Sequence, residues 1–196
     1  MSQAIDPKAA DVRSQIMEAA THLFAEKGYG STSVRELVEA AGVTKPTLYY
    51  YFDNKEALFL EIVHGHIEGL EQLVQMVVQS PGSVQERLRQ FARLYVSGAE
   101  ENKDAVKLLM TVKSPEGDQP KVDLMSMHLA AIQHLTVLFE EGIASGELRS
   151  TIDPQASVMA FIGTVNLLCA ACVQGMPVTP DSPDKAVDII FFGVGA

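Results

Sequence analysis

Apolar residues recur along this chain with the three-to-four-residue period of an α-helix. In the first such stretch Ile16, Ala20 and Phe24 fall on one face, and Gly28 follows where a helix would end. No segment shows the alternation of a β-strand. The chain is therefore predicted to be all-α, with about nine helices. Later helices are expected over residues 55–79, 83–99, 102–112, 121–145 and 155–174, with a last one from about residue 184.

Capping signals divide the first part of the chain into short helices. Ser33 with Glu36 three residues on forms a capping box, and Gly42 ends the helix that it starts. Thr44 can cap the next helix, and Pro46 would occupy its first turn, where the missing N–H costs nothing. Short helices joined by a tight glycine turn predict a helix-turn-helix.

Three consecutive tyrosines lie on the helix that Thr44 begins. Leu48 and Phe52 are four residues apart and form its core side. Hydroxyls and one ammonium would then line the rest of the circumference, where they can reach phosphates and base edges in a DNA groove. The alternative is that the tyrosines fill the interface between a small domain and a large one. The polar side of this helix consists of Lys45, Thr47, Tyr49, Tyr50 and Tyr51.

Lys55 lies at the start of the following helix, a few residues beyond the tyrosines. Asp53 is expected to cap this helix, with Glu56 at its third position. The ammonium of Lys55 and the backbone N–H groups of the first turn can hold the same DNA phosphate. Lys55 is therefore a second candidate for a backbone contact.

Residues 23–59, LFAEKGYGSTSVRELVEAAGVTKPTLYYYFDNKEALF, resemble the DNA-binding domain of the tetracycline-repressor (TetR) family of bacterial regulators. One departure is Pro46, where many members carry glycine or a small residue. The resemblance implies a homodimer whose recognition helices enter the major groove of a roughly palindromic operator. It implies a DNA-binding domain over 1–54 and a larger ligand-binding and dimerisation domain over 55–196. The implied DNA contacts are Ser33, Thr44, Lys45, Thr47, Tyr49, Tyr50, Tyr51 and Lys55.

The last two predicted helices are expected to form the dimer interface. The helix over 155–174 is apolar nearly all round, which predicts full burial. Together with the final helix it holds more apolar surface than one subunit can cover. Pairing two such helices from each subunit gives the four-helix contact expected of a two-fold homodimer. The apolar residues expected there are Phe161, Ile189, Ile190 and Phe192.

Polar groups on otherwise apolar helix faces indicate a binding pocket in the second domain. Tyr95 lies on the inner face of its helix, and Asn166 lies inside the most apolar one. The alternative for each such residue is ordinary core packing. Since no cation is expected on an inner face, the predicted ligand is small and mostly apolar or aromatic, without a deeply buried anionic group. The candidate ligand contacts are His66, Phe91, Tyr95, Met110, His128 and Asn166.

The formal net charge of −10 argues against a protein whose surface is positively charged throughout for binding nucleic acid. The first 60 residues hold six Lys and Arg against eight Asp and Glu, whereas the remainder holds nine against seventeen. The acidity therefore lies mostly beyond residue 60. A DNA-binding role must depend on where individual cations are placed.

Metal, cofactor and enzyme chemistry find little support in the sequence. Cys169 and Cys172 have CxxC spacing, but they lie among apolar residues with no second pair. They are expected in the core, and a redox or zinc site is the alternative. No GxSxG motif, phosphate-binding glycine loop or inward pair of carboxylates is present. The protein is therefore expected to be no enzyme and to hold no cofactor or metal.

The longest apolar run, residues 158–173, is expected to be too short for a membrane span. The N-terminal MSQAIDPKAADVR lacks the apolar core of a signal peptide, and two cysteines make no disulfide framework. A soluble, cytoplasmic protein is expected. The chain ends in FFGVGA without a polar cap, which suggests that the natural chain continues.

Two classes of function remain open. The first is a transcriptional repressor that a small apolar ligand releases from DNA. The second is a helix-turn-helix protein that a partner protein regulates.

Overall fold

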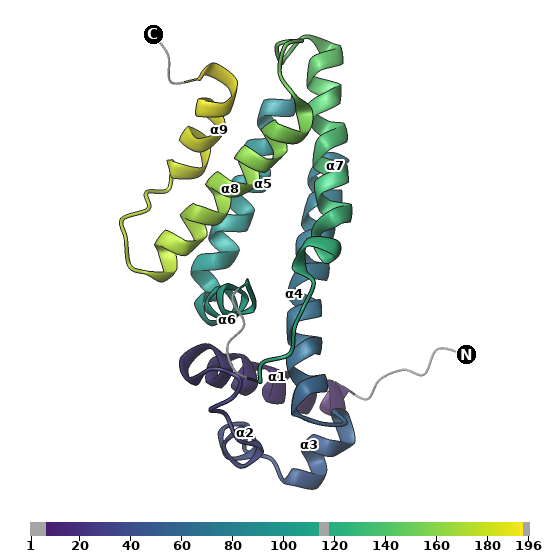
Figure 1. Cartoon of the computed structure of the whole chain (residues 1–196), viewed down its shortest axis with the longest axis vertical. Coiled ribbons are helices and arrows are strands. Elements are labelled where there is room, and N and C mark those ends of the chain that lie inside the picture. Colours follow the sequence, from purple (N-terminus) through teal and green to yellow (C-terminus); the bar gives the residue numbers. More distant parts are fainter. Residues whose placement is uncertain (1–6, 114–117, 194–196) are drawn as a thin grey trace, which may run out of the picture. The chain divides into compact units, whose positions relative to one another are not determined.

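The computed structural model describes residues 7–113 and 118–193, and within these residues all regular secondary structure is helical. The all-α prediction is confirmed. Figure 1 shows the helices in chain order. In the described residues they are α1 (Pro7–Lys27), α2 (Val34–Ala40), α3 (Lys45–Tyr51), α4 (Lys55–Val78), α5 (Val84–Glu101), α6 (Lys103–Lys113), α7 (Leu124–Ser145), α8 (Pro154–Val173) and α9 (Ser182–Phe192).

The capping signals predicted for α2 and α3 are confirmed. Ser33 Oγ accepts the N–H of Glu36, and the Glu36 carboxylate accepts the N–H of Ser33 at 2.8 Å. Thr44 Oγ1 accepts the N–H of Thr47 at the start of α3. Between the two helices Gly42 has a φ of +64°, a conformation that side chains with a Cβ rarely adopt. These local contacts set the short turn of the helix-turn-helix.

The start of α4 differs from the expectation. Asp53 was expected as its cap, but Oδ1 of Asn54 accepts the N–H of Ala57 at 2.8 Å. Asn54 is therefore the capping residue, and α4 begins at Lys55. Asp and Asn cap helices about equally well, so the spacing alone could not decide between two adjacent candidates.

The chain forms two compact units. One comprises the chain up to His66 together with Lys107–Val122, and the other comprises Ile67–Val106 and the chain from Asp123 onward. The predicted functional division after residue 54 differs from this partition, because the first turns of the continuous helix α4 pack with α1 to α3. The first unit thus also contains most of α6 and the segment that follows it.

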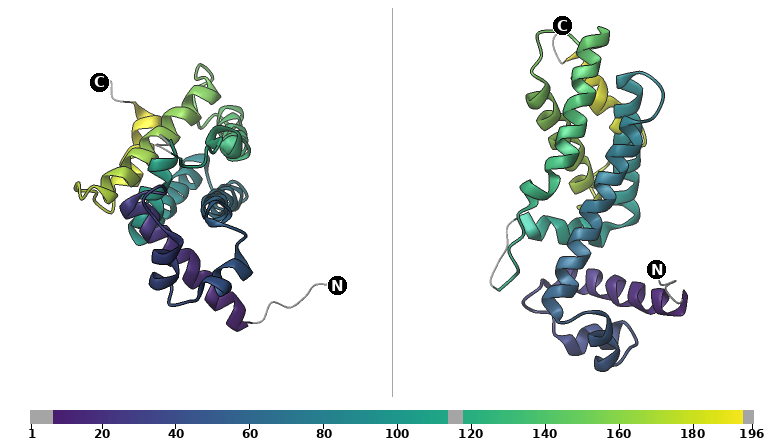
Figure 2. Two further views of the ribbon diagram at one scale, coloured as in Figure 1. Left: turned by 60° about the horizontal axis from the view of Figure 1, so that its bottom comes forward. Right: turned by 90° about the vertical axis from the view of Figure 1, so that its right-hand side faces the viewer.

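Three aromatic rings form the centre of the first unit. Phe24, Tyr29 and Phe59 lie with ring centroids 5.0 to 5.7 Å apart, two of the three pairs edge to face. Leu48 of α3 and Phe52, which follows α3, are buried; α3 packs against α2, and the Arg13 side chain of α1 lies over the Phe52 ring. Two views show α2 and α3 on the same side of α1 (Figures 1 and 2). Packing of Leu48 and Phe52 leaves the opposite face of α3 outward.

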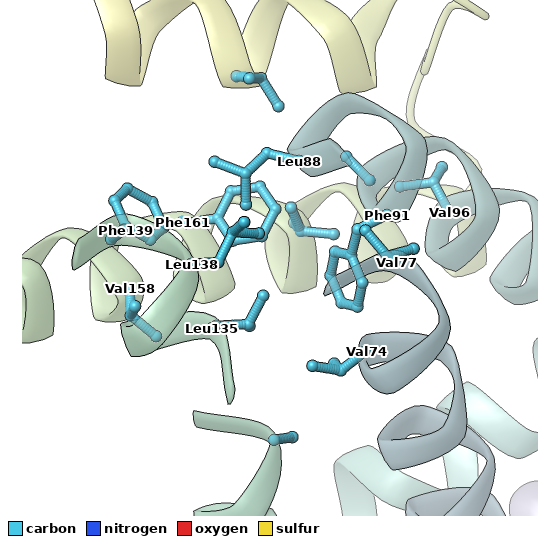
Figure 3. Close-up of a cluster of buried hydrophobic side chains, with 14 of the residues drawn as sticks. Val74, Val77, Leu88, Phe91, Val96, Leu135, Leu138, Phe139, Val158 and Phe161 are labelled. Atoms are coloured by element: carbon cyan, nitrogen blue, oxygen red, sulfur yellow. The ribbon is translucent and has the colours of Figure 1, made fainter. Parts of the chain in front are cut away.

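The second unit has its core between α5, α7 and α8, with α9 and the second half of α4 around it. Figure 3 shows Phe91, Phe139 and Phe161 among the converging aliphatic side chains. The ring of Phe161 lies 5.6 Å from that of Phe91 and 6.4 Å from that of Phe139. The inward stripes predicted for these helices supply this core.

Within one subunit α8 is buried on one face and exposed on the other, so the predicted burial on all sides depends on a second subunit. Val158, Phe161 and Val165 are buried, but Met159 is 52% exposed and Leu167 is 66% exposed. The helix α8 is longer than the apolar run seen in the sequence: it has 20 residues, and an 18-residue window of it has a mean hydropathy of 2.0, which is enough for a membrane span by length and composition alone, as it is for core helices of soluble proteins. About a third of it is buried against other helices of this unit.

Candidate functional site

The polar face of α3 carries the candidate DNA contacts. Leu48 is fully buried and Phe52 is 2% exposed, so the predicted core side anchors the helix. Tyr49 and Tyr50 are 48% and 81% exposed, and Lys45 is exposed. An anchored helix that holds large aromatic side chains outward provides a surface suited to a binding partner.

Tyr51 supports its neighbour on this face. Its ring contacts the ring of Tyr50 edge to face, with centroids 5.0 Å apart at 88°, and lies 6.5 Å from the ring of Phe52. Tyr51 is half-buried. The ring of Tyr50 therefore rests on a second aromatic side chain that is joined to the core, which limits its side-chain freedom before binding.

The hydroxyls of Thr44 and Thr47 lie 2.8 Å apart and share one hydrogen bond. Each hydroxyl has one O–H to donate. Whichever threonine donates within the pair, the other O–H remains for an outside acceptor such as a phosphate oxygen. The two predicted contact residues therefore offer one such donor between them.

The hydroxyl of Ser33 is used within its own capping box. Its O–H donates to Oε2 of Glu36 at 2.8 Å while its oxygen accepts the N–H of Glu36. The ammonium of Lys27 and the cap bonds of Ser33 hold the pKa of Glu36 at about 2, so this carboxylate is ionised at neutral pH. A phosphate contact from Ser33 would need the O–H to leave Glu36, and this contact stays a prediction.

Lys55 is bound within the protein. Its ammonium donates to the carbonyls of Tyr29 and Thr32 at 2.9 and 3.1 Å, and it lies 4.0 Å above the Tyr29 ring. Two of its three N–H donors are thereby used. Sequence spacing could not foresee this contact, because it joins α4 to the loop between α1 and α2. The predicted phosphate contact of Lys55 would depend on its third donor.

In the second unit the structure brings together three of the predicted ligand contacts. The O–H of Tyr95 donates to Oδ1 of Asn166 at 3.1 Å, and the ring of Tyr95 stacks on that of Phe91 with centroids 5.5 Å apart. Burial of Tyr95 raises its pKa to about 12. The two polar groups are thus partners of each other, which agrees with the alternative of core packing and leaves their ligand role a prediction.

The other predicted ligand contacts come from both units of the chain. His66 and Met110 belong to the first unit, where His66 is half-buried and Met110 is 39% exposed. Burial lowers the pKa of His66, which favours its neutral form. His128 is half-buried on α7 of the second unit. The ligand role of these three residues stays a prediction.

A buried cation in the second unit was not expected from the sequence. Arg87 is 6% exposed, and its guanidinium pairs with Glu141 and donates to the carbonyl of Val78 at 2.9 Å. The expectation that no cation stands on an inward face is therefore wrong. Arg87 lies next to Leu88 on the edge of the apolar stripe of α5, and this position was the available signal. Its charge is already paired.

A hollow of about 290 Å³ was likewise missed. It lies where α8 ends, and Cys172 at its wall donates its S–H to Oε1 of Glu100 at 3.8 Å. Burial and the Glu100 carboxylate raise the pKa of Cys172, so the thiol stays protonated near neutral pH. Its lining consists of Glu100, Lys103, Cys172, Gly175, Met176 and Val178.

Exposed apolar side chains gather on the last two helices. Besides Met159 and Leu167 of α8, Ile189 and Phe192 of α9 are 52% and 68% exposed. Phe161, which was expected in the dimer contact, is instead fully buried in the subunit core. Helical spacing in the sequence identifies apolar faces on a helix, but where a helix has two such faces it does not show which one packs against the core of the subunit.

Ion pairs attach α9 to α5. Arg93 makes two bonds of 2.7 Å to the carboxylate of Asp184, and Arg89 pairs with Asp188. The arginines are four residues apart on α5 and the aspartates four apart on α9, so the two pairs lie one helical turn apart. These ion pairs hold α9, whose Ile189 and Phe192 are exposed, on the second unit.

Comparisons with known proteins agree with this architecture. Residues 16–62 match the family model described as bacterial regulatory proteins, tetR family. The chain is 27% identical to the HTH-type transcriptional repressor KstR2 of Rhodococcus jostii (strain RHA1) over 174 residues, which are 88% of this chain and 85% of that protein.

Two solved structures share the fold at low identity. One is the transcriptional regulator FadR from Bacillus subtilis in complex with stearoyl-CoA, with 20% identity, a TM-score of 0.74 and coverage of 93% of this chain and 99% of that chain. The other is AibR in complex with isovaleryl coenzyme A and operator DNA, with 22% identity, a TM-score of 0.74 and coverage of 92% and 98%.

The helix-turn-helix with its anchored recognition helix, followed by a larger helical unit, defines a DNA-binding transcriptional regulator. The chain belongs to the TetR family of bacterial regulators.

Proposed function

We propose that this protein is a cytoplasmic repressor that binds a palindromic operator as a homodimer and is released by a small, mostly apolar ligand. The observation that carries the DNA-binding part is α3, where Lys45, Tyr49 and Tyr50 are exposed on a helix anchored by Leu48 and Phe52. Two such helices in a two-fold dimer would contact half-sites about 34–36 Å apart, or slightly more.

The dimer would form through the exposed apolar faces of α8 and α9. Met159, Leu167, Ile189 and Phe192 support this proposal because four large apolar side chains on two adjacent helices are a poor surface for a monomer. A symmetric contact between two copies would cover the same residues on each subunit. The interface would then be self-complementary without further chains.

The comparisons favour a larger ligand than the sequence does, namely a coenzyme A thioester, whose acyl part is apolar and whose nucleotide part is anionic. FadR was solved with stearoyl-CoA and AibR with isovaleryl coenzyme A. We propose that the acyl part of such a ligand enters the apolar core beside Phe91, and that Tyr95 and Asn166 bind its polar carbonyl. Arg87 is already paired with Glu141, so this buried cation is not available to the anionic nucleotide part of the ligand. The nucleotide part would therefore stay near solvent.

Ligand binding would act through α4, which is one continuous helix from Lys55 to Val78. A shift of its second half would displace Lys55 and the loop that Lys55 holds. Release requires a ligand that prefers the displaced state, and each factor of ten in preference corresponds to about 1.4 kcal/mol.

The test uses a fluorescent duplex that carries a site selected by the protein itself. Isovaleryl-CoA, stearoyl-CoA, free coenzyme A and the free acids are added to the complex, and anisotropy reports DNA release. We expect release by a thioester but not by free coenzyme A. If none of these compounds, nor a wider set of hydrophobic compounds, releases DNA or raises the melting temperature, the alternative of regulation by a partner protein replaces the ligand model.

A further inference from the structure

The cations of the first unit differ in how they are paired. Arg13 pairs with Glu61, and Lys27 and Arg35 pair with glutamates at 2.7 Å. Lys55 donates to two carbonyls. Among the side chains described between residues 11 and 62, Lys45 is the one cation without an acidic or carbonyl partner. Its ammonium is exposed and keeps all three donors.

The position of Lys45 is unfavourable for the helix itself. Lys45 is the first residue of α3, and the first turn of that helix holds no acidic residue. A cation there faces the positive end of the helix dipole. The first turn of α2, by contrast, carries Glu36. A residue that breaks a local rule without a compensating contact in the free protein points to a partner that supplies one.

The chemistry of the exposed face distinguishes Lys45 from its neighbours. Thr44 and Thr47 keep one O–H between them, and Tyr49 and Tyr50 offer hydroxyls at the ends of long rings. Each of these groups can donate or accept, so a phosphate or several base edges would satisfy it. The ammonium of Lys45 only donates. In the major groove guanine presents two adjacent acceptors, O6 and N7, whereas adenine pairs an acceptor with a donor and thymine offers one acceptor.

We propose that Lys45 is the base-reading cation of this protein and selects a guanine in each operator half-site. In helix-turn-helix proteins the first residues of the recognition helix face the base edges, which is where Lys45 lies. The inference rests on the proposed DNA-binding function and adds to it the base pair that one side chain recognises. The tyrosines and threonines of α3 would then position the helix on the backbone.

The test compares the wild type with Lys45→Met on duplexes selected from a random pool by the full-length protein. We expect a G·C pair at one symmetric position of each half-site. Replacing that pair by A·T should weaken the wild type roughly five- to 150-fold, the range of a good base contact, and should leave the affinity of Lys45→Met nearly unchanged. Lys121→Met, which removes an exposed cation outside the helix-turn-helix, is the matched control and should respond as the wild type does.

Several outcomes would overturn the inference. A selected site without a symmetric G·C pair would do so, and so would an equal response of the wild type and Lys45→Met to the base change. Uniform weakening of Lys45→Met on all sequences would assign Lys45 to a phosphate. A wild type that selects no sequence at all would overturn the proposed DNA-binding function together with this inference, whereas failure of every ligand to release DNA would leave the inference intact.

Discussion

The O–H of Tyr95 donates to Oδ1 of Asn166 across the interface of α5 and α8 at 3.1 Å, where both side chains are half-buried beside the apolar core. Both residues were predicted as ligand contacts, yet in the free protein the Tyr95 hydroxyl and the Asn166 side-chain carbonyl already bind each other. A polar group of a ligand must therefore replace this bond to gain from it. The net gain would be smaller than that of a contact to an unpaired donor.

Removing the Tyr95 hydroxyl should destabilise the free protein. Tyr95→Phe leaves the amide of Asn166 without its partner, and we expect a loss of about 1–3 kcal/mol in the free energy of unfolding. Urea denaturation measures it. Asn166→Leu in the Tyr95→Phe background should recover part of the loss, because both polar groups are then gone. If Tyr95→Phe costs nothing, the hydrogen bond is not formed in solution.

Titration of Tyr95 should make the protein less stable at high pH. Its pKa rises from the ordinary 10.0 to about 12, because burial disfavours the phenolate. Between these two values the unfolded chain loses the proton first, so the free energy of unfolding should fall as the pH rises from 10 to 12. Denaturation midpoints across this range, compared with those of Tyr95→Phe, measure the effect. Parallel curves for the two proteins would show that Tyr95 does not contribute.

Lys55 should matter for stability as well as for DNA. Lys55→Met removes two charged hydrogen bonds to the carbonyls of Tyr29 and Thr32, and a loss of about 1.5–3 kcal/mol in the free energy of unfolding is expected. Lys45→Met is the matched control, since its ammonium has no partner among the described residues and its removal should cost nothing. Equal stability of the two variants, measured in urea, would contradict the role of Lys55 as a link to the α1–α2 loop.

Charge introduced on the exposed faces of α8 and α9 should separate the subunits. Leu167→Asp or Ile189→Asp would place a carboxylate in the proposed dimer contact, and we expect monomers in analytical ultracentrifugation with loss of operator binding. Val137→Asp on α7, a site that is 56% exposed, is the matched control and should stay dimeric. A Leu167→Asp variant that also stays dimeric would move the interface elsewhere.

Phe161→Asp should behave differently from these variants. Phe161 is fully buried between Phe91 and Phe139, so a carboxylate there would unfold the subunit and not merely separate the dimer. Loss of the helical circular dichroism signal at room temperature, with no folded monomer on a sizing column, is the expected result. A folded monomer of Phe161→Asp would restore the original assignment of this residue to the interface.

The sequence by itself determined the local structure of the DNA-binding part. The capping box of Ser33 and Glu36, the glycine turn at Gly42 and the cap at Thr44 depend on contacts three or four residues apart, which spacing reveals. The same holds for the division of α3 into a core side and an exposed side. Family membership followed from the same short stretch, because its motifs are dense and local.

Only the tertiary structure decided which partners distant residues meet. Lys55 finds carbonyls 23 and 26 residues away, and Tyr95 finds Asn166 71 residues away. Both faces of α8 are apolar in sequence. Only the packing of α8 against α5 and α7 decides that Phe161 is buried and Leu167 is exposed. Helical periodicity carries no information about such contacts, because it reports the local orientation of a side chain and not the element that packs against it.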